Sequence, residues 1–514
     1  MLLMQQCRFC RVLSPKTGLI SRINSMEMDR QYHFWGRKIV LGHIFAGMMV
    51  GLSLNAHAED FTQALVSAYM KNPRLMAERA RVREADENYV QAQAQGRFTV
   101  NANATIGRER REGGSFFNQD PSVQTPKTAQ LSIVKPLYQG GRVRGLKAQA
   151  KAGINSARQS LRNAEQNVLL AAATAYLDVI RDEEATKIRR NNVRVLTQQG
   201  FAAQDRFDVG EGTRTDIAQS RARLASAESG LAQAEAQLAT SRASFVRYMG
   251  HMPEQLQSPP TFELPATLRE AQLLARANNP QMIASRYNEN AAQAAVFVAK
   301  SAGRPTVALQ SVFQGTRDSA NGISRSDSMS IVAQLRVPLY QGGLNQSRVR
   351  AAKHAVTRAR FESRDIEIAI DQAIANLWAQ IDSAKLSLKA SEKQVEAAEI
   401  AFEGVKLEQE VGTRNTLDVL NAEQELLNAR LSVVDAQRAL NVATMQMLVT
   451  MGAFDAYALQ LPVNMYDPEQ NFNQVTKDPF MYYVPDFIEK PAEKVIDKSK
   501  GAVGFTVGKV GKDT

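Results

Sequence analysis

The chain contains very little cysteine and histidine, and this scarcity excludes several kinds of chemistry. Its 514 residues include two cysteines, Cys7 and Cys10, whose C-x-x-C spacing lies in a segment that we expect to be removed. We therefore interpret the pair as accidental rather than as a zinc or redox site. Beyond residue 58 the histidines are His251 and His354, too few for a histidine metal centre or a serine–histidine pair. The sequence predicts no enzyme activity, no cofactor and no bound metal.

Long apolar runs are equally scarce. The exception is residues 39–54, which follow a basic start and precede the small-x-small motif Ala56-His57-Ala58. This order predicts a secretory signal peptide over residues 1–58, cleaved after Ala58, rather than a transmembrane anchor, for which the run is short. The true start is expected near Met26 or Met28. No later segment is apolar enough for a transmembrane helix, so a role in a membrane would have to use β-strands.

The chain has an excess of positive charge, but a mild one. The formal net charge is +11, and residues 1–58 hold much of that excess. The remaining Asp and Glu are spread among Lys and Arg, mostly at spacings typical of solvated pairs on helices. The basic segments lack interleaved aromatic residues, so we expect no nucleic-acid partner.

The hexapeptide Pro-Leu-Tyr-Gln-Gly-Gly occurs twice, at 136–141 and, 202 residues later, at 338–343. A strand-like run precedes each copy and a long helical pattern follows it. Proline blocks regular strand pairing and the glycines allow a turn, so each copy predicts a junction where a β-hairpin ends and a helix begins. A phosphate-binding loop is the alternative, but neither copy is followed by Lys-Ser/Thr. The junction residues are Pro136, Gly140, Gly141, Pro338, Gly342 and Gly343.

Alternating apolar and polar residues before each junction predict two β-hairpins. The first is expected at 98–137, with a charged loop over 109–126 that contains Gly and Pro. The second is expected at 304–338, with a loop over 317–327. Strands of about ten residues suit a tilted crossing of a bilayer. Soluble hairpins with one wet face are the alternative.

Two very long helices follow the junctions. Residues 142–207 and 344–408 contain no proline, and their apolar residues recur at three- and four-residue steps. Each predicts a continuous helix of roughly 100 Å. Helices of this length cannot bury their apolar stripes in a compact domain, so they are expected to pack side by side as a coiled-coil bundle. Each is expected to turn at a Val-Gly pair and return as a second helix.

The duplication divides the mature chain into three parts. Residues 59–260 form a first structural repeat with a helical hairpin at 142–250. Residues 261–452 form the second, with a helical hairpin at 344–452. Each repeat begins with a helical segment that is broken at an Asn-Pro pair. Residues 453–514 are expected to form a tail, partly ordered and then flexible.

This organisation resembles the TolC family of trimeric outer-membrane channel-tunnels. The similarity covers residues 59–452, and it rests on the duplicated junction together with the turn Val-Gly-Thr-Arg-x-Thr-Leu-Asp-Val-Leu at 411–420. It implies a mainly α fold with an internal two-fold repeat and long helical hairpins that form a periplasmic α-barrel. Four β-strands per protomer would close a 12-stranded membrane barrel in the trimer. Three copies are physically reasonable, because four strands cannot close a barrel and open strand edges are not tolerated in lipid.

The resemblance also implies which residues close the channel. In the family the helical turns point away from the outer membrane, and the inner hairpins constrict the tunnel there. Family members often carry Tyr at the position of Gln409 and Asp at that of Asn421, and this sequence departs from both. Asp216 and Asp418 also stand in the first turn of a returning helix, where a carboxylate caps free N–H groups, and we expect both roles. The matching gate positions are Thr215, Asp216, Gln409, Arg414, Asp418 and Asn421.

The partners implied by the resemblance are those of an export channel. The chain would be a passive homotrimeric duct for efflux or type I secretion in the outer membrane of a Gram-negative bacterium. It would work with a periplasmic adaptor protein and an inner-membrane ABC or proton-driven transporter, and helix tips that splay apart would open it. The runner-up is that the chain is itself a periplasmic adaptor, although adaptors usually have one helical hairpin. The exposed residues expected to dock an adaptor are Val209, Gly210, Val411, Gly412 and Thr413.

Overall fold

The computed structural model describes residues 59–111, 122–320 and 323–477. The chain divides into two units, Met1–Asn55 and Ala56–Thr514, and the described residues belong to the second. The predicted signal peptide, its cleavage residues Ala56 and Ala58, and the predicted flexible end of the tail lie outside the described residues.

Each half of the unit begins with a broken helix. In the first half α1 (Phe61–Lys71) is followed by α2 (Pro73–Ala94), and in the second half α5 (Leu268–Asn278) is followed by α6 (Pro280–Ser301). The break is an Asn-Pro pair each time. The asparagine side chain accepts a hydrogen bond from the first turn of the next helix, and the proline needs no partner at its first position.

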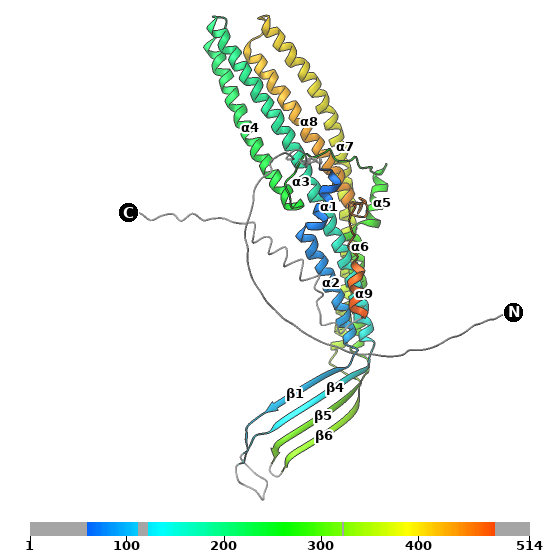
Figure 1. The fold of residues 1–514 in the computed structure, drawn as a ribbon. Helices are drawn as coiled ribbons and strands as arrows, with labels where there is room; N and C mark the ends of the chain where they lie inside the picture. The colour runs from blue at the N-terminus through cyan, green and yellow to red at the C-terminus, as the bar shows by residue number, and fades with distance from the viewer. Residues whose placement is uncertain (1–58, 112–121, 321–322, 478–514) are drawn as a thin grey trace, which may run out of the picture. The chain divides into compact units, whose positions relative to one another are not determined.

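Two helical hairpins dominate the unit (Figure 1). The first consists of α3 (Arg142–Asp208) and α4 (Arg214–Met249), and the second of α7 (Leu344–Glu410) and α8 (Thr416–Thr450). α3 packs against α8, so the hairpins lie side by side with their turns at the same end. A short helix, α9 (Pro468–Lys477), packs on α2.

A core of aromatic rings holds α1, α3 and α4 together. Phe61 and Phe245 pack against the ring of Tyr176, which is fully buried, and Phe262 contacts Phe61 and Phe454. The Tyr176 hydroxyl lies 3.0 Å from the carbonyl of Glu59 and 2.8 Å from that of Gln257. Burial raises the pKa of Tyr176 to about 12, so the phenol stays protonated and ties the start of the unit to the linker after α4.

One antiparallel sheet combines strands from both halves, in the order β1-β4-β5-β6. Its strands are β1 (Thr99–Ile106), β4 (Lys127–Gln139), β5 (Thr306–Ala320) and β6 (Ile323–Arg336). The pairing of β4 with β5 joins the two halves. Figure 1 shows the sheet at the end of the long helices opposite their turns.

Both predicted loops contain strand residues, which corrects the sequence prediction. Two short strands, β2 (Glu109–Arg111) and β3 (Ser122–Gln124), pair within the predicted loop 109–126. The prediction of a loop over 317–327 is wrong, because β5 and β6 pair as far as Ala320 and Ile323. The ladder continues through polar residues because β-pairing needs only main-chain groups, whereas the prediction relied on side-chain alternation.

The first proline junction also differs from the prediction. β4 continues through Pro136 to Gln139 and pairs with β5, with an irregularity between Pro136 and Tyr138. Pairing of β4 with β1 has already ended at Val134, and a bulge tolerates a residue without an N–H donor. Pro338 follows the end of β6 at Arg336, as predicted. The two copies therefore differ in structure although their sequences are identical.

Candidate functional site

The turn of the first hairpin is closed by a capping box. α3 ends at Asp208, and Gly210 takes a positive φ of 83° that turns the chain. Thr213 caps α4: its Oγ1 accepts a hydrogen bond of 3.2 Å from the Asp216 N–H, and Asp216 Oδ2 accepts one of 3.0 Å from the Thr213 N–H. Both members of the box therefore cap the start of α4. Thr215 lies beside them and is exposed.

The turn of the second hairpin has the same build with an added cation. Gly412 has a φ of 81°, and Asn415 Oδ1 accepts a hydrogen bond of 2.9 Å from the N–H of Asp418. Arg414 donates to Glu408 Oε2 at 2.8 Å, and its guanidinium lies 3.9 Å from Asp418. The hydrogen bond to Glu408 raises the pKa of Arg414, which stays charged. The helix tip thus presents one arginine between two carboxylates.

Gln409 and Asn421, the two predicted gate positions at which this chain departs from the family pattern, make polar contacts. Gln409 is buried and donates a hydrogen bond of 3.2 Å to Thr416 Oγ1 within its own hairpin. Asn421 accepts one of 3.0 Å from Arg223 on α4, so it bridges the two hairpins. The structure therefore brings Gln409, Arg414 and Asp418 together at one tip, while Asn421 faces the neighbouring hairpin.

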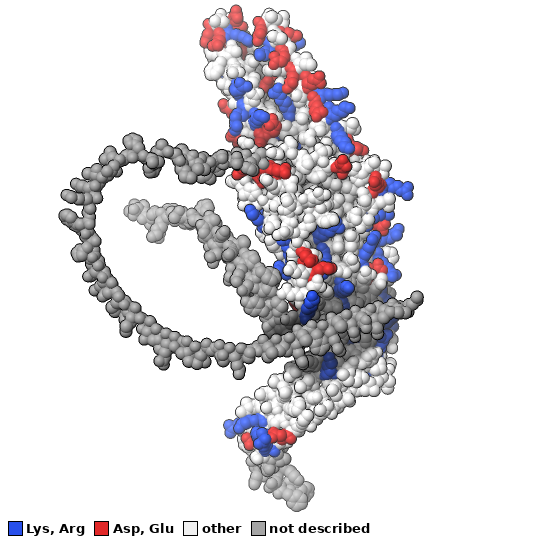
Figure 2. Space-filling view, turned by 45° about the vertical axis from the view of Figure 1, so that its right-hand side comes forward, with Lys and Arg blue, Asp and Glu red and all other residues white. Residues whose placement is uncertain are grey.

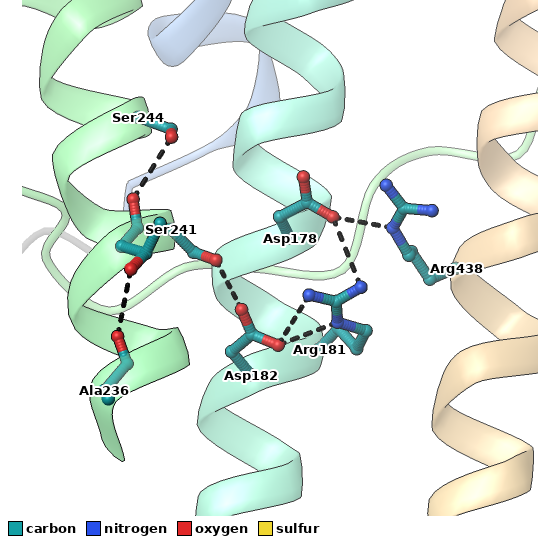
Figure 3. A network of polar contacts seen from close by, with 8 residues as sticks. Asp178, Arg181, Asp182, Ala236, Ser241, Ser244 and Arg438 are labelled. Carbon is teal, nitrogen blue, oxygen red and sulfur yellow. Dashed lines mark hydrogen bonds and ion pairs between the residues drawn. The ribbon is translucent and has the colours of Figure 1, made fainter. Parts of the chain in front are cut away.

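Two further contacts between the hairpins lie below the tips. Asn192 on α3 donates to Glu423 on α8 at 2.9 Å, and both side chains are buried. About halfway along α3, Arg438 from α8 donates from Nε to Asp178 at 2.6 Å (Figure 3). Asp178 also lies 3.8 Å from Arg181. These contacts hold the hairpins together at two levels.

Figure 3 shows that the network continues into α4. Arg181 donates to Asp182 at 2.7 Å, and the opposite oxygen of Asp182 accepts from the hydroxyl of Ser241 on α4. Asp182 and Ser241 are buried. The Asp182 carboxylate accepts hydrogen bonds from both helices and so ties α4 to α3.

The residues expected to dock a partner are exposed at the two turns. Val209 is 72% exposed and Val411 is 76% exposed, which is unusual for a large aliphatic side chain. Nothing lies within 4 Å of where a side chain at Gly210 or Gly412 would begin. The Thr413 hydroxyl donates to the Glu408 carbonyl at 2.8 Å and fixes the turn. Each turn therefore presents one exposed valine side chain, Val209 or Val411, to the solvent.

The two junctions have different surroundings. Gly140 has a φ of 60°, and a side chain there would collide with Arg304 and the Ser301 carbonyl, at the end of α6. Arg304 donates to the Gly140 carbonyl at 3.1 Å. Gly342 and Gly343 also have positive φ, but nothing within 4 Å would meet a side chain on either. The first junction packs against the second repeat, and the second faces open space in this chain.

The sheet has two faces of different character. Because residues that are opposite in register share a face, the pairing Ala102–Leu131–Phe313–Met329 identifies one face as mostly apolar. Next to it, Asn103–Gln130–Gln314–Ser328 lie on the other face, which is mostly polar. Leu131, Phe313 and Met329 are exposed. The contrast emerges only when the four strands are aligned.

Charged side chains close the loop end of the sheet (Figure 2). Asp327 accepts from Arg317 at 2.8 Å and from Arg325 at 2.6 Å, and Lys127 lies 3.5 Å from Asp318. Figure 2 shows an uncharged band between this group and the helices. The sheet therefore carries an apolar band with a charged border.

Sequence reasoning missed several residues of these sites. Glu408, Arg223 and the pair Asp178–Arg438 were not predicted, because their partners are brought together by a turn or by packing of separate hairpins. No helical spacing relates such residues in the sequence. Among the described residues, no group of three or more His, Cys, Asp or Glu side chains is placed to hold a metal ion. None of the described helices is both long and apolar enough to cross a membrane.

Comparison with known families and proteins identifies the relatives of this chain. The family model "Outer membrane efflux protein" matches residues 64–251 and 273–453. The chain is 32% identical to the outer membrane efflux protein BepC of Brucella suis, over 84% of this chain and 93% of that protein. It is 23% identical to the outer membrane protein TolC of Escherichia coli, over 76% and 82%.

Solved structures share the fold at low identity. The Campylobacter jejuni CmeC outer membrane channel has a TM-score of 0.68 at 15% identity, covering 81% of this chain and 89% of that chain. The CusC structure has a TM-score of 0.66 at 17% identity, covering 76% and 92%. The predicted fold class is thereby confirmed, including the two-fold repeat that the two matched segments reflect.

Proposed function

The chain belongs to the outer membrane efflux protein family, and from that premise we propose how its parts form and control an export channel. It is an outer-membrane efflux or secretion channel of a Gram-negative bacterium, with its helical part in the periplasm. Members of the family are passive channels rather than enzymes. The proposals below concern assembly, gating and partners.

The channel is a homotrimer that is closed by strand pairing between copies. The observation that carries this proposal is the two-faced sheet with two open edges, β1 and β6. An apolar outer face and a polar inner face are what a strand-built wall in a membrane requires, and its edges must be paired. With three copies, twelve strands form a closed wall, and pairing of β6 with the next copy's β1 repeats the β4–β5 pairing.

The unequal junctions support this assembly. In the first copy of the hexapeptide, residues up to Gln139 pair with β5 of the next repeat. In the second copy, residues 337–341 are not a strand, and Leu339 and Tyr340 are 91% and 86% exposed. In the trimer, the strand next to these residues would be β1 of the neighbouring copy. Applying the β4–β5 register there places Ala333 opposite Ile106 of the next copy, and both residues lie on the apolar face.

Disulfide trapping tests this register. The chain has no cysteine beyond Cys10, so introduced cysteines are the only ones in the mature protein. Ala333→Cys with Ile106→Cys should give covalently linked trimers under oxidising conditions, because opposite residues bring their Cβ atoms within bonding reach. A matched control moves one partner by two residues on the same face: Ala333→Cys with Ala104→Cys should link poorly. Equal linking in both variants, or none in either, contradicts the proposed pairing.

The second hairpin carries the gate. Three copies of Asp418 and Arg414 near a common axis would set up a ring of alternating charge that closes the tip. Arg414 already pairs with Glu408, so the arginine is held in position for a carboxylate on a neighbouring copy. In the closed state the hydrogen bond from Arg223 to Asn421 would keep the two hairpins together. Thr215 and Asp216 would contribute to the closed tip from the first hairpin. The buried Gln409 side chain would stabilise the tip through its hydrogen bond to Thr416.

Conductance measurements test the gate. Arg414→Ala combined with Asp418→Ala should raise single-channel conductance in planar bilayers and leakage of antibiotics across the outer membrane. The matched control neutralises an exposed pair far from the tip, Arg190→Ala with Glu235→Ala. Unchanged conductance in the double variant at the tip would count against the gate assignment.

The two turns dock a periplasmic adaptor, which links the channel to an inner-membrane ABC or proton-driven transporter. Support comes from the exposed Val209 and Val411 and from the open space around Gly210 and Gly412. Bulky residues at both glycines should abolish export while trimers still assemble, and persistent export would place docking elsewhere. The relatives named above are channel proteins, and they give no support to the alternative that this chain is itself the adaptor.

A further inference from the structure

Basic residues without acidic neighbours gather where the long helices leave the sheet. No Asp or Glu occurs in residues 142–164, the start of α3, or in 344–361, the start of α7. Beyond these stretches both helices carry acidic and basic residues together. Both repeats show the same segregation: Lys151 and Lys353 are equivalent by the 202-residue offset, whereas the other basic positions next to the sheet differ.

The basic side chains next to the sheet have no ion-pair partner among the residues that the structure describes. The next basic residues along these helices include several ion pairs: Arg158 with Glu469, Arg162 with Asp455, and Arg360 with Glu289. Within the first three turns of α3 and α7, the exposed basic residues, none of which has an acidic partner in the described parts of the chain, are Arg142, Arg144, Lys151, Arg348, Arg350 and Lys353. In the first three turns of each helix the basic charge therefore has no acidic counterpart within the helix itself.

Four of these six lie on helix faces that an outer layer covers farther along. Arg162 follows Arg144 by 18 residues, which is five helical turns, and it donates to Asp455. Lys151 precedes Arg158 by seven residues, again on the same side, and Arg158 binds Glu469 at 2.9 Å. Asp455 and Glu469 both belong to segment 453–477, which packs on this face of α3. Because this segment would block the duct if it lay inside, we take this face of α3 as the outer one.

The same argument holds for α7. Asp371 follows Lys353 by 18 residues, and it accepts a hydrogen bond of 2.9 Å from Arg276 on α5, another part of the outer layer. Arg350 lies one turn before Lys353 on that side. Arg142 and Arg348 point to other sides of their helices, because two residues turn the helix by about 200°.

We propose that Arg144, Lys151, Arg350 and Lys353 form a basic collar that binds the phosphates of anionic phospholipids in the periplasmic leaflet of the outer membrane. The collar rests on the membrane location described above. Arg144 and Arg350 are within the first two turns after the sheet, and Lys151 and Lys353 are about 14 Å along their helices. Long basic side chains can reach back toward head groups from such positions. At the opposite border of the apolar band the cations already have acidic partners, such as Asp318 and Asp327.

Charge complementarity favours lipid over other occupants. A cluster of Lys and Arg beside a membrane segment attracts anionic head groups, and the attraction weakens within about 10 Å and with added salt. The collar faces outward, so a solute inside the duct would not meet it. Its effect would be to fix the depth and tilt of the channel relative to the membrane.

The experiment compares the full-length protein in nanodiscs of phosphatidylcholine with nanodiscs that also contain phosphatidylglycerol. We expect a higher Tm with phosphatidylglycerol, a difference that shrinks at high salt. The variant R144Q/K151Q/R350Q/K353Q should lose this upward shift. The variant R144K/K151R/R350K/K353R, which keeps the charges, should retain it. Inorganic phosphate added to phosphatidylcholine nanodiscs should not reproduce the shift if membrane lipid rather than free phosphate is the ligand.

The matched control neutralises four exposed lysines nearer the tips, K187Q/K385Q/K389Q/K393Q, and should keep the lipid-dependent shift. The proposal would be overturned if the collar variant kept the full increase in Tm with phosphatidylglycerol, whether or not its ion selectivity changed. Conductance separates this outcome from a failure of the channel itself. If the collar variant still conducts but loses the lipid-dependent shift in Tm, lipid binding by the collar is supported. If the parent protein does not conduct, the proposed channel assembly is contradicted, and the comparison of Tm between the two kinds of nanodisc still tests lipid binding.

Discussion

Arg438 on α8 donates a hydrogen bond of 2.6 Å to Asp178 on α3, and this contact joins the two helical hairpins about halfway along α3 (Figure 3). Both side chains are largely shielded, with 29% and 24% exposed. The tips beyond this level are joined through Asn192–Glu423 and Arg223–Asn421. A channel that opens by splaying its tips must keep some level fixed, and this pair is well placed to do so.

Removing the Arg438 side chain should therefore weaken the link between hairpins. Arg438→Ala is expected to lower the free energy of unfolding by about 2 kcal/mol, because it removes a shielded hydrogen bond to a charged group. Urea unfolding measures the change, and a double-mutant cycle with Asp178→Asn isolates the pair. The matched control is Arg190→Ala, whose partner Glu235 is exposed. There a loss below about 0.5 kcal/mol is expected, and equal losses at both sites would contradict the role of shielding.

Two substitutions at Asp418 separate capping from gating. Asp418→Asn keeps a side-chain acceptor near Asn415 but removes the charge, so conductance should rise while stability changes little. Asp418→Ala removes both and should also lower the free energy of unfolding by about 1 kcal/mol. Planar-bilayer recordings and thermal unfolding of the two variants give the comparison. If Asp418→Asn conducts like the parent, the carboxylate charge does not close the tip.

The attachment of α9 should depend on pH through Asp86. This carboxyl is fully buried, Oδ2 accepts a hydrogen bond of 2.9 Å from Asn471, and Oδ1 has no partner. Burial raises the pKa of Asp86 above its ordinary value of 3.8, against the opposing effects of Asn471 and Arg158. The folded protein therefore holds this proton to a higher pH than the unfolded chain does.

By linkage, the contribution of Asp86 to stability is full below pH 3.8 and declines as pH rises through its folded pKa. Asp86→Asn should flatten this part of the stability profile and raise Tm at neutral pH. Scanning calorimetry between pH 4 and 7 provides the measurement. Glu165 also has a raised pKa through burial, so Glu165→Gln should remove a separate part of the slope. A profile that is as steep in Asp86→Asn as in the parent would contradict this assignment.

Two glycines that each follow the end of a long helix should tolerate substitution very differently. Gly452 has a φ of 75°, and a side chain there would collide with the Asn278 carbonyl group where α5 ends. Gly412 has a similar φ of 81° but open space around it. Gly412→Ala should cost only the backbone strain, about 1 kcal/mol. Gly452→Ala should cost clearly more, about 3 kcal/mol or above. Similar decreases in Tm for Gly412→Ala and Gly452→Ala would show that the residues around Gly452 can move to accommodate a methyl group.

The order and type of the helices were predictable because their signals are local. A long stretch without proline, an Asn-Pro pair or a Val-Gly turn each acts over a few residues. The capping role of Asp216 and Asp418 follows from the same short range. The strand ladders were less predictable, since the polar ends of β5 and β6 pair through main-chain groups and leave no alternation to detect.

The sequence by itself determined the duplicated architecture, the long helical hairpins and the positions of their turns, because helix formation and capping depend on neighbours within about four residues. Only the tertiary structure decided which residues meet across the hairpins and across the sheet. Arg438 finds Asp178, and β4 finds β5, through contacts between residues far apart in the chain. Identical hexapeptides end differently for the same reason: one has a neighbouring strand within this chain, and the other faces an open edge.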